Sequence, residues 1–273
     1  MGTYVTIASA RRTCGILEAE ISDADVESTI VEVEAQIPRF FNTFFKPTEV
    51  IEIEDGDGTN RHHLSKNPVL SVRELKIDGT AEDVDNLEIQ KASGYIFLGS
   101  GASTPTFADK RNSVVVKYIH GSVVISQTVS TTSSAAEVAG TAVSVAVASS
   151  TNFAEDDWVE IFGMDGHKEA AQISSISTGV IVLDQLVLTH ESGSTVVKLE
   201  IDTNFIKLMN IVCGIALVAR IIGQSYTDTV GYNLGELHVQ KGEPYTQWRE
   251  AANQLIKERD QIMSRISIRP YII

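Results

Sequence analysis

The most constraining stretch of this sequence is residues 204–223, which read NFIKLMNIVCGIALVARIIG. It is apolar on nearly every helical face and is interrupted only by Lys207, Asn210 and Arg220. An apolar run of about 18 residues or more is long enough to cross a membrane as a helix. Charged side chains are costly at bilayer depth, and no basic cluster flanks this run to orient it. We therefore interpret it as the buried central helix of a soluble fold, and expect a neighbouring element to come close at Gly214.

Composition sets the outer limits of the fold and of the function. The chain has 273 residues, enough for one large domain or two ordinary ones. Its formal net charge of −14 argues against a general affinity for nucleic acid. The two cysteines, Cys14 and Cys213, lie far apart in sequence, so we expect reduced thiols. The first residues, MGTYVTIASARR, lack the apolar run of a signal peptide, and secretion is not predicted.

The N-terminal part predicts two helices followed by an aromatic group. Residues 3–20 form a short helical entry, with Gly15 as its end. Ser22 then places a hydroxyl at an N-cap, and Asp23 and Asp25 follow in the first turn. Apolar residues continue at helical spacing until Pro38: Val26, Ile30, Val33 and Ile37. The aromatic group that follows is expected either to fill the core or to contact another subunit: Phe40, Phe41, Phe44 and Phe45.

From Thr48 the apolar period changes to two, which indicates strands. Short extended segments are predicted near residues 50–53, 69–77 and 113–119, and a hairpin over 87–98. The acidic turn Asp55–Gly58 resembles the start of a calcium loop, but no glutamate follows where a bidentate ligand is needed. We therefore interpret it as a hairpin turn.

The composition changes at about Ser122. Residues 122–150 are dominated by Ser, Thr, Ala and Val, and several short apolar segments then follow, separated by Gly, Ser or Asp. This pattern predicts a small all-β barrel or sandwich over residues 122–201. The predicted fold class is α+β: a helical bundle core with a β-hairpin or small sheet element, formed by residues 1–121 and 202–273, and interrupted by the inserted β domain.

The C-terminal part predicts an amphipathic helix and an apolar tail. Glu243-Pro244 begins the helix, and Trp248, Leu255, Ile262 and Ile266 form one apolar stripe. The helix cannot continue past Pro270. The tail that remains ends in Tyr271, Ile272 and Ile273, and we expect it to be buried in this subunit or in a partner.

No pattern of residues predicts catalysis. The sequence lacks a nucleophile elbow, a phosphate-binding Gly-Lys-Ser/Thr loop, paired metal-binding cysteines and a His-Glu metal helix. Gly99–Ala102 is glycine-rich, but no such loop or helical pattern follows it. His62 and His63 are adjacent, so on a strand they would point to opposite faces. We predict a protein that is not an enzyme, with no cofactor and no metal site.

The order of these parts resembles the head–tail connector (adaptor) proteins of tailed bacteriophages. The likeness covers residues 1–121 and 202–273 and is one of pattern. The segments that carry it, besides the long apolar helix, are Tyr4-Val5-Thr6, Ile21–Glu27, Pro68–Val72, Val114–Gly121 and Ile268-Arg269-Pro270. The predicted β domain looks like an insertion where other members pass directly from strand to helix.

This resemblance implies a structural protein of the virion neck, assembled in the host cytoplasm. Subunits of the family form a ring, usually twelve-fold, beneath the portal protein, and the ring extends the DNA channel. Its other partner would be the next neck, stopper or tail-completion protein. The genomic DNA would pass an acidic surface without specific binding, and no membrane is involved.

The resemblance also implies which residues meet the partners. The expected portal-binding residues are Trp248, Arg269, Pro270, Tyr271, Ile272 and Ile273. The expected contacts between subunits are Phe40, Phe41, Phe44 and Phe45.

Two other function classes remain open on the sequence alone. One is a phage-associated binding module for carbohydrate or for a capsid or tail surface, carried by the inserted β domain. A hydrolytic module of this kind should show a carboxylate pair framed by aromatic residues. The other class is a membrane-anchored protein, which would use residues 204–223.

Overall fold

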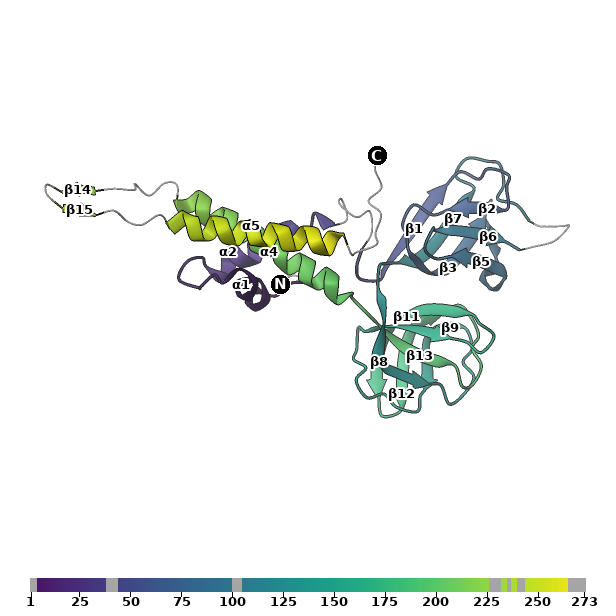
Figure 1. The fold of residues 1–273 in the computed structure, drawn as a ribbon. Coiled ribbons are helices and arrows are strands. Elements are labelled where there is room, and N and C mark those ends of the chain that lie inside the picture. The colour runs from purple at the N-terminus through teal and green to yellow at the C-terminus, as the bar shows by residue number, and fades with distance from the viewer. Residues whose placement is uncertain are drawn as a thin grey trace. The chain divides into compact units, whose positions relative to one another are not determined.

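The computed structural model describes residues 4–37, 44–99, 105–225, 232–234, 237–239 and 244–264, with side chains described as far as Ile221 and again from Arg249. The chain forms two compact units, drawn in Figure 1. One unit combines Met1–Phe41 with Thr203–Ile273 and contains the helices; the other is Asn42–Asp202 and contains three β-sheets. We call them the helical unit and the β unit.

The helical unit is built from both ends of the chain. Local signals set its first two helices. Thr6 and Ser9 form a capping box at the start of the first, and Gly15 ends it in the left-handed conformation. The Ser22 side chain accepts a hydrogen bond from the Asp25 amide and begins the second, as predicted. The elements of this unit are α1 (Ile7–Cys14), α2 (Asp23–Glu34), α4 (Thr203–Ser225), the hairpin β14 (Tyr232–Leu234) and β15 (Leu237–Val239), and α5 (Pro244–Met263).

Helix α4 is the centre of this unit and contacts α1, α2 and α5. In Figure 1, α4 in green and α5 in yellow run side by side. Residues Thr203–Ile221 are long and apolar enough to cross a membrane, and 56% of this window is buried within the chain. Its two charged side chains pair with neighbouring helices: Arg220 lies 2.8 Å from Asp25 of α2, and Lys207 lies 2.6 Å from Glu258 of α5. These pairs belong to a helix packed among helices, and the predicted central position is confirmed.

Two helices approach α4 closely at Gly214. A Cβ atom at this position would lie 3.4 Å from Cys14 Cβ of α1 and 3.4 Å from Leu255 Cδ1 of α5. The predicted close approach is therefore confirmed. Cys14 and Cys213 are both buried and free, as expected, and burial raises the pKa of the Cys213 thiol to about 12.

The effect of a substitution at Gly214 on stability should depend on the size of the new side chain. Gly214→Ala is expected to leave stability unchanged or raise it by up to about 1 kcal/mol, because alanine is the better helix former and its Cβ only reaches van der Waals contact. Gly214→Leu should lower stability by about 3 kcal/mol through overpacking. Chemical denaturation followed by the helical circular dichroism signal measures both. A leucine variant as stable as the alanine variant would contradict the close packing.

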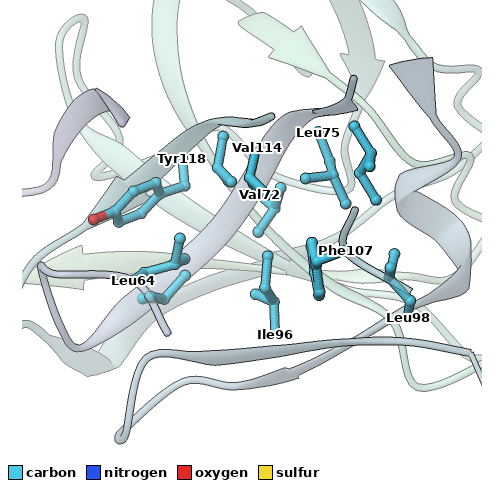
Figure 2. Packing of buried hydrophobic residues seen from close by; sticks show 11 residues of the cluster. Leu64, Val72, Leu75, Ile96, Leu98, Phe107, Val114 and Tyr118 are labelled. Atoms are coloured by element: carbon cyan, nitrogen blue, oxygen red, sulfur yellow. The ribbon is translucent and has the colours of Figure 1, made fainter. Parts of the chain in front are cut away.

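The first part of the β unit consists of two antiparallel sheets that enclose one core. Figure 2 shows Val72, Leu75 and Val114 from one sheet meeting Ile96 and Leu98 from the other. One sheet has the order β1-β7-β3-β4 and the other β2-β6-β5. Their strands are β1 (Thr48–Glu54), β2 (Arg61–His63), β3 (Val69–Ile77), β4 (Thr80–Glu82), β5 (Leu87–Gln90), β6 (Tyr95–Leu98) and β7 (Val114–His120), with the 3-10 turn η1 (Val84–Asn86) before β5.

The second part is a six-stranded antiparallel sheet of order β8-β13-β10-β11-β12-β9. Its two outer strands also meet. The Ser134 amide donates to the Ala146 carbonyl at 2.8 Å, and the Ala148 amide donates to the Thr132 carbonyl at 3.0 Å. The sheet therefore closes on itself as a small barrel. Its strands are β8 (Val124–Thr132), β9 (Gly140–Ala146), β10 (Trp158–Phe162), β11 (Lys168–Ser177), β12 (Val180–Leu186) and β13 (Thr195–Glu200).

The two parts of the β unit are joined by direct contacts. An apolar cluster contains Leu70 and Ile119 from the two-sheet part and Ala170 and Leu199 from the barrel. Beside it, Arg73 of β3 lies 3.1 Å from Asp184 of β12.

The predicted α+β fold class, with a helical bundle core and a small sheet element, is wrong. Thirteen strands in three antiparallel sheets dominate the part of the chain that the structure describes, which holds only four α-helices. The physical reason is that residues 44–121 build a two-sheet core of their own. These residues and the barrel belong to one compact unit that begins at Asn42. The sequence pattern had instead predicted that residues 42–121 belong with the helices.

Two local predictions in this region had opposite outcomes. The hairpin over residues 87–98 is confirmed as β5 paired with β6. The hairpin at Asp55–Gly58 is wrong, because β1 pairs with β7 and β2 pairs with β6. The acidic turn instead carries the chain from one sheet to the other.

Candidate functional site

The predicted contact residues fall into two groups. Phe45 is 1% exposed, so its ring fills the core, the first of the two roles considered for this aromatic group. The Phe44 ring lies 5.5 Å from the His120 ring. Phe40, Phe41, the Trp248 side chain and the tail from Arg269 to Ile273 lie outside the described part of the chain. Contact of these residues with a portal or with another subunit stays a prediction.

The barrel contains a buried acid–base group that the sequence did not reveal. Glu137 and His190 exchange two backbone hydrogen bonds, of 2.7 and 2.8 Å. The His190 Nε2 atom lies 3.4 Å from the Glu169 carboxylate. Burial raises the pKa of the Glu137 carboxyl group. Only closure of the barrel brings His190 together with Glu137 and Glu169.

The geometry of this group indicates a structural role. Glu169 accepts hydrogen bonds from the amides of Val187 and Leu188, at 2.6 and 3.0 Å. Glu137 and His190 are at most 6% exposed, and Glu169, which is 1% exposed at the lining of a cavity, is held by the Val187 and Leu188 amides. Together they fix the segment after β12 against the chain before β9.

A second group of buried polar residues lies in the two-sheet part. The Tyr118 hydroxyl donates to Glu52 at 2.6 Å and accepts from the Lys66 amide at 3.1 Å. Burial, together with the bond to Glu52, raises the pKa of the Tyr118 hydroxyl. Tyr118 therefore stays protonated and links β7, β1 and the segment after β2.

One cavity of about 270 Å³ opens in the β unit, between the two-sheet part and the barrel. Its apolar lining includes Val72, Ile89 and Leu188, and its charged lining consists of Lys91, Lys168, Asp85, Glu88 and Glu169. Among the described residues no Phe, Tyr or Trp lines it, although the His167 ring does. A hydrolytic module was expected to frame a carboxylate pair with aromatic residues, and this cavity has carboxylates without that frame.

Of the strands that the structure describes, β1 carries the most solvent-exposed pair of large apolar side chains. Ile51 is 61% exposed and Ile53 is 60% exposed, whereas the alternating residues Glu52 and Glu54 are half-buried. This alternation is the reverse of an ordinary half-buried strand, in which the apolar side chains face the core. In the strand order β1 is also the end of its sheet.

The two units differ in charge. The β unit has 23 acidic and 11 basic side chains, a formal charge of −12. The helical unit has 13 acidic and 11 basic side chains, a formal charge of −2. Most of the net negative charge is therefore carried by residues 42–202.

Within the described residues, no group of three or more His, Cys, Asp or Glu side chains is arranged to hold a metal ion. Comparison with known proteins adds no assignment: the sequence matches no protein-family model and no curated protein.

Proposed function

We propose that this chain is a structural protein of a phage virion, a head–tail adaptor that forms a ring beneath the portal and extends the DNA channel. The observation that carries the proposal is the helical unit, in which the two ends of the chain meet around α4. Its order is two short helices, an intervening β unit, a long apolar helix, a hairpin and a last helix. The early helix, the strands that follow it, the long apolar helix and the last helix are the parts on which the resemblance to connector proteins depends.

The charge of the chain fits a DNA channel. A surface of high negative charge repels the phosphate backbone, so DNA passes without being retained. The β unit carries this charge, and it contains residues 122–201, the part in which the chain differs from other connectors. In this proposal the tail after α5 faces the portal, and the β unit faces the channel and the next neck protein.

Electron microscopy of the purified chain, alone and mixed with the portal protein of the same virion, tests the proposal. We expect ring-shaped particles that cap the portal at one end. Immunogold labelling should then locate the chain at the neck of the virion. Labelling on the tail fibres or the capsid shell, or no association with the portal, would contradict the proposed function.

Removal of Arg269–Ile273 should weaken portal attachment while folding stays intact. Tyr271, Ile272 and Ile273 are apolar, and each aliphatic side chain buried against a partner contributes about 1.5–3 kcal/mol. The affinity for the portal should therefore fall at least tenfold in a co-sedimentation assay. The melting temperature of the truncated chain serves as the control, because a large drop would show that the tail folds back on its own core.

A further inference from the structure

The free edge of β1 is a site to which another strand can be added. β1 pairs with β7 on one side, and no described strand pairs with its other side. An edge strand leaves backbone N–H and C=O groups unpaired, and proteins usually protect such edges with charge or cover them. Strand addition to an open edge is a common way of binding an extended segment.

The side chains of β1 specify what that added strand must look like. On the exposed face, Ile51 and Ile53 offer an apolar pair. On the opposite face, Glu52 binds Tyr118 and Ser65, while Glu54 is 37% exposed beside His62. Pairing of β1 with β1 of a second copy would bring acidic side chains together, which is unfavourable. The fitting strand therefore has two apolar residues on one face and basic residues on the other.

The sequence of the chain contains such a segment after α5. Residues 265–269 read Arg-Ile-Ser-Ile-Arg, and Pro270 follows. In an extended conformation, successive side chains point to opposite faces. Ile266 and Ile268 would share one face, and the two arginines with Ser267 the other. Proline ends such a strand, because it cannot donate to a ladder.

The side-chain patterns of β1 and of residues 265–269 match whether the two strands run parallel or antiparallel. When the isoleucines at positions 266 and 268 lie opposite Ile51 and Ile53, Ser267 lies opposite Glu52. One of the two arginines then lies opposite Glu54 whether the strands run parallel or antiparallel. Cross-strand pairs of β-branched residues and of opposite charges are the favourable ones.

We propose that residues 265–269 of one copy add as a strand to the free edge of β1 in the neighbouring copy. The contact joins two different surfaces of the same chain, and a contact of this kind closes into a ring when the rotation between copies permits. The inference rests on the proposed function in one respect, that copies associate, and it supplies the contact between them. Tyr271–Ile273 stay beyond the added strand and remain available to the portal.

Two double variants of the full chain test the contact. Ile51→Thr with Ile53→Thr alters only the strand, and Ile266→Thr with Ile268→Thr alters only the tail; threonine keeps the β-branched shape. We expect the unmodified chain to associate in sedimentation velocity. Each variant alone should sediment as a single chain of 29.7 kDa. An equimolar mixture of the two variants should form a dimer and nothing larger, because it has one complete contact.

The matched control is Val138→Thr, which changes a residue of the β unit that is 71% exposed and lies outside β1. This variant should associate like the unmodified chain. A synthetic peptide of residues 264–273 should also dissociate the assemblies of the unmodified chain, and a scrambled peptide should not. This second measurement keeps the test informative if a double variant fails to fold.

The outcomes separate this inference from the proposed function. An unmodified chain that stays single, variants that associate normally, or a mixture that forms no dimer would each overturn the strand contact. Binding of the Ile51→Thr, Ile53→Thr variant to the portal is measured independently, since its tail is unchanged. Portal binding together with normal association of both double variants would leave the proposed function standing and remove the inference, whereas an unmodified chain that neither associates nor binds the portal would remove both.

Discussion

Replacing Asp184 with alanine is expected to lower the free energy of unfolding of the β unit by about 3 kcal/mol. The Arg73 side chain is only 1% exposed, and Asp184 is its carboxylate partner at 3.1 Å. Removal of one member of a buried ion pair leaves an uncompensated charge and costs about 3–5 kcal/mol. Asp184 is 38% exposed, which places the expected loss at the lower end of that range. Urea denaturation followed by tryptophan fluorescence reports it, because Trp158 belongs to the apolar cluster beside the pair.

The control for Asp184→Ala is the double variant with Arg73→Met. Methionine fills the space of the arginine stem without a charge, so the double variant should be more stable than Asp184→Ala alone. Asp184 also accepts a hydrogen bond from the Gln172 amide, and both variants lose this bond equally. If the double variant were the less stable of the two, the carbonyl contacts of Arg73 with Ala170 and Gln185 would dominate, not its charge pair.

The sequence predicted those elements whose signals are local. Ser22 caps α2, and Gly15 ends α1, because a hydroxyl and a left-handed glycine act within one turn of the helix. The central helix was predictable from a long apolar run, and the hairpin β5–β6 from two short runs around a Ser-Gly turn. In each case the residues that make the contact are close in sequence, or the composition alone requires burial.

The sequence did not predict pairings between distant segments. β1 pairs with β7, so that Val50 lies opposite Tyr118, and no turn residue signals a partner so far along the chain. Without that pairing, residues 44–121 looked like hairpins attached to a helical bundle. Instead, their strands bury a common core, which among the described residues is built from residues 50–118.

The candidate sites depended on the same long-range information. Phe45 stood in an aromatic group whose burial the sequence left open, and only the folded chain places it in the core. Glu137, Glu169 and His190 are far apart in sequence and meet because the barrel closes. The exposed pair on β1 is visible in the sequence as Ile-Glu-Ile-Glu, but the face that points to solvent is set by the pairing with β7.

Stability of the β unit should fall as the pH is lowered from about 6.5 to about 4, and His120 should be a main cause. Its side chain is fully buried, and neither ring nitrogen has a hydrogen-bond partner among the described residues. Burial, reinforced by the nearby charge of Lys66, lowers the pKa of His120 to about 4 from its ordinary value of 6.5. The unfolded chain therefore takes up a proton first, which favours unfolding throughout this interval.

The linkage between protonation of His120 and unfolding gives the size of this loss of stability. Above pH 6.5 the histidine is neutral in both states and its contribution does not change; through the interval down to its folded pKa, about 3 kcal/mol is lost. His120→Phe keeps a ring beside Phe44 and Tyr118 and removes the titrating group. The free energy of unfolding of this variant, measured by urea denaturation across the interval, should fall by about 3 kcal/mol less than that of the unmodified chain. Parallel curves would show that His120 is already protonated or hydrated in the folded protein. His62, whose pKa burial also lowers, acts in the same direction and accounts for part of the loss that remains in the variant.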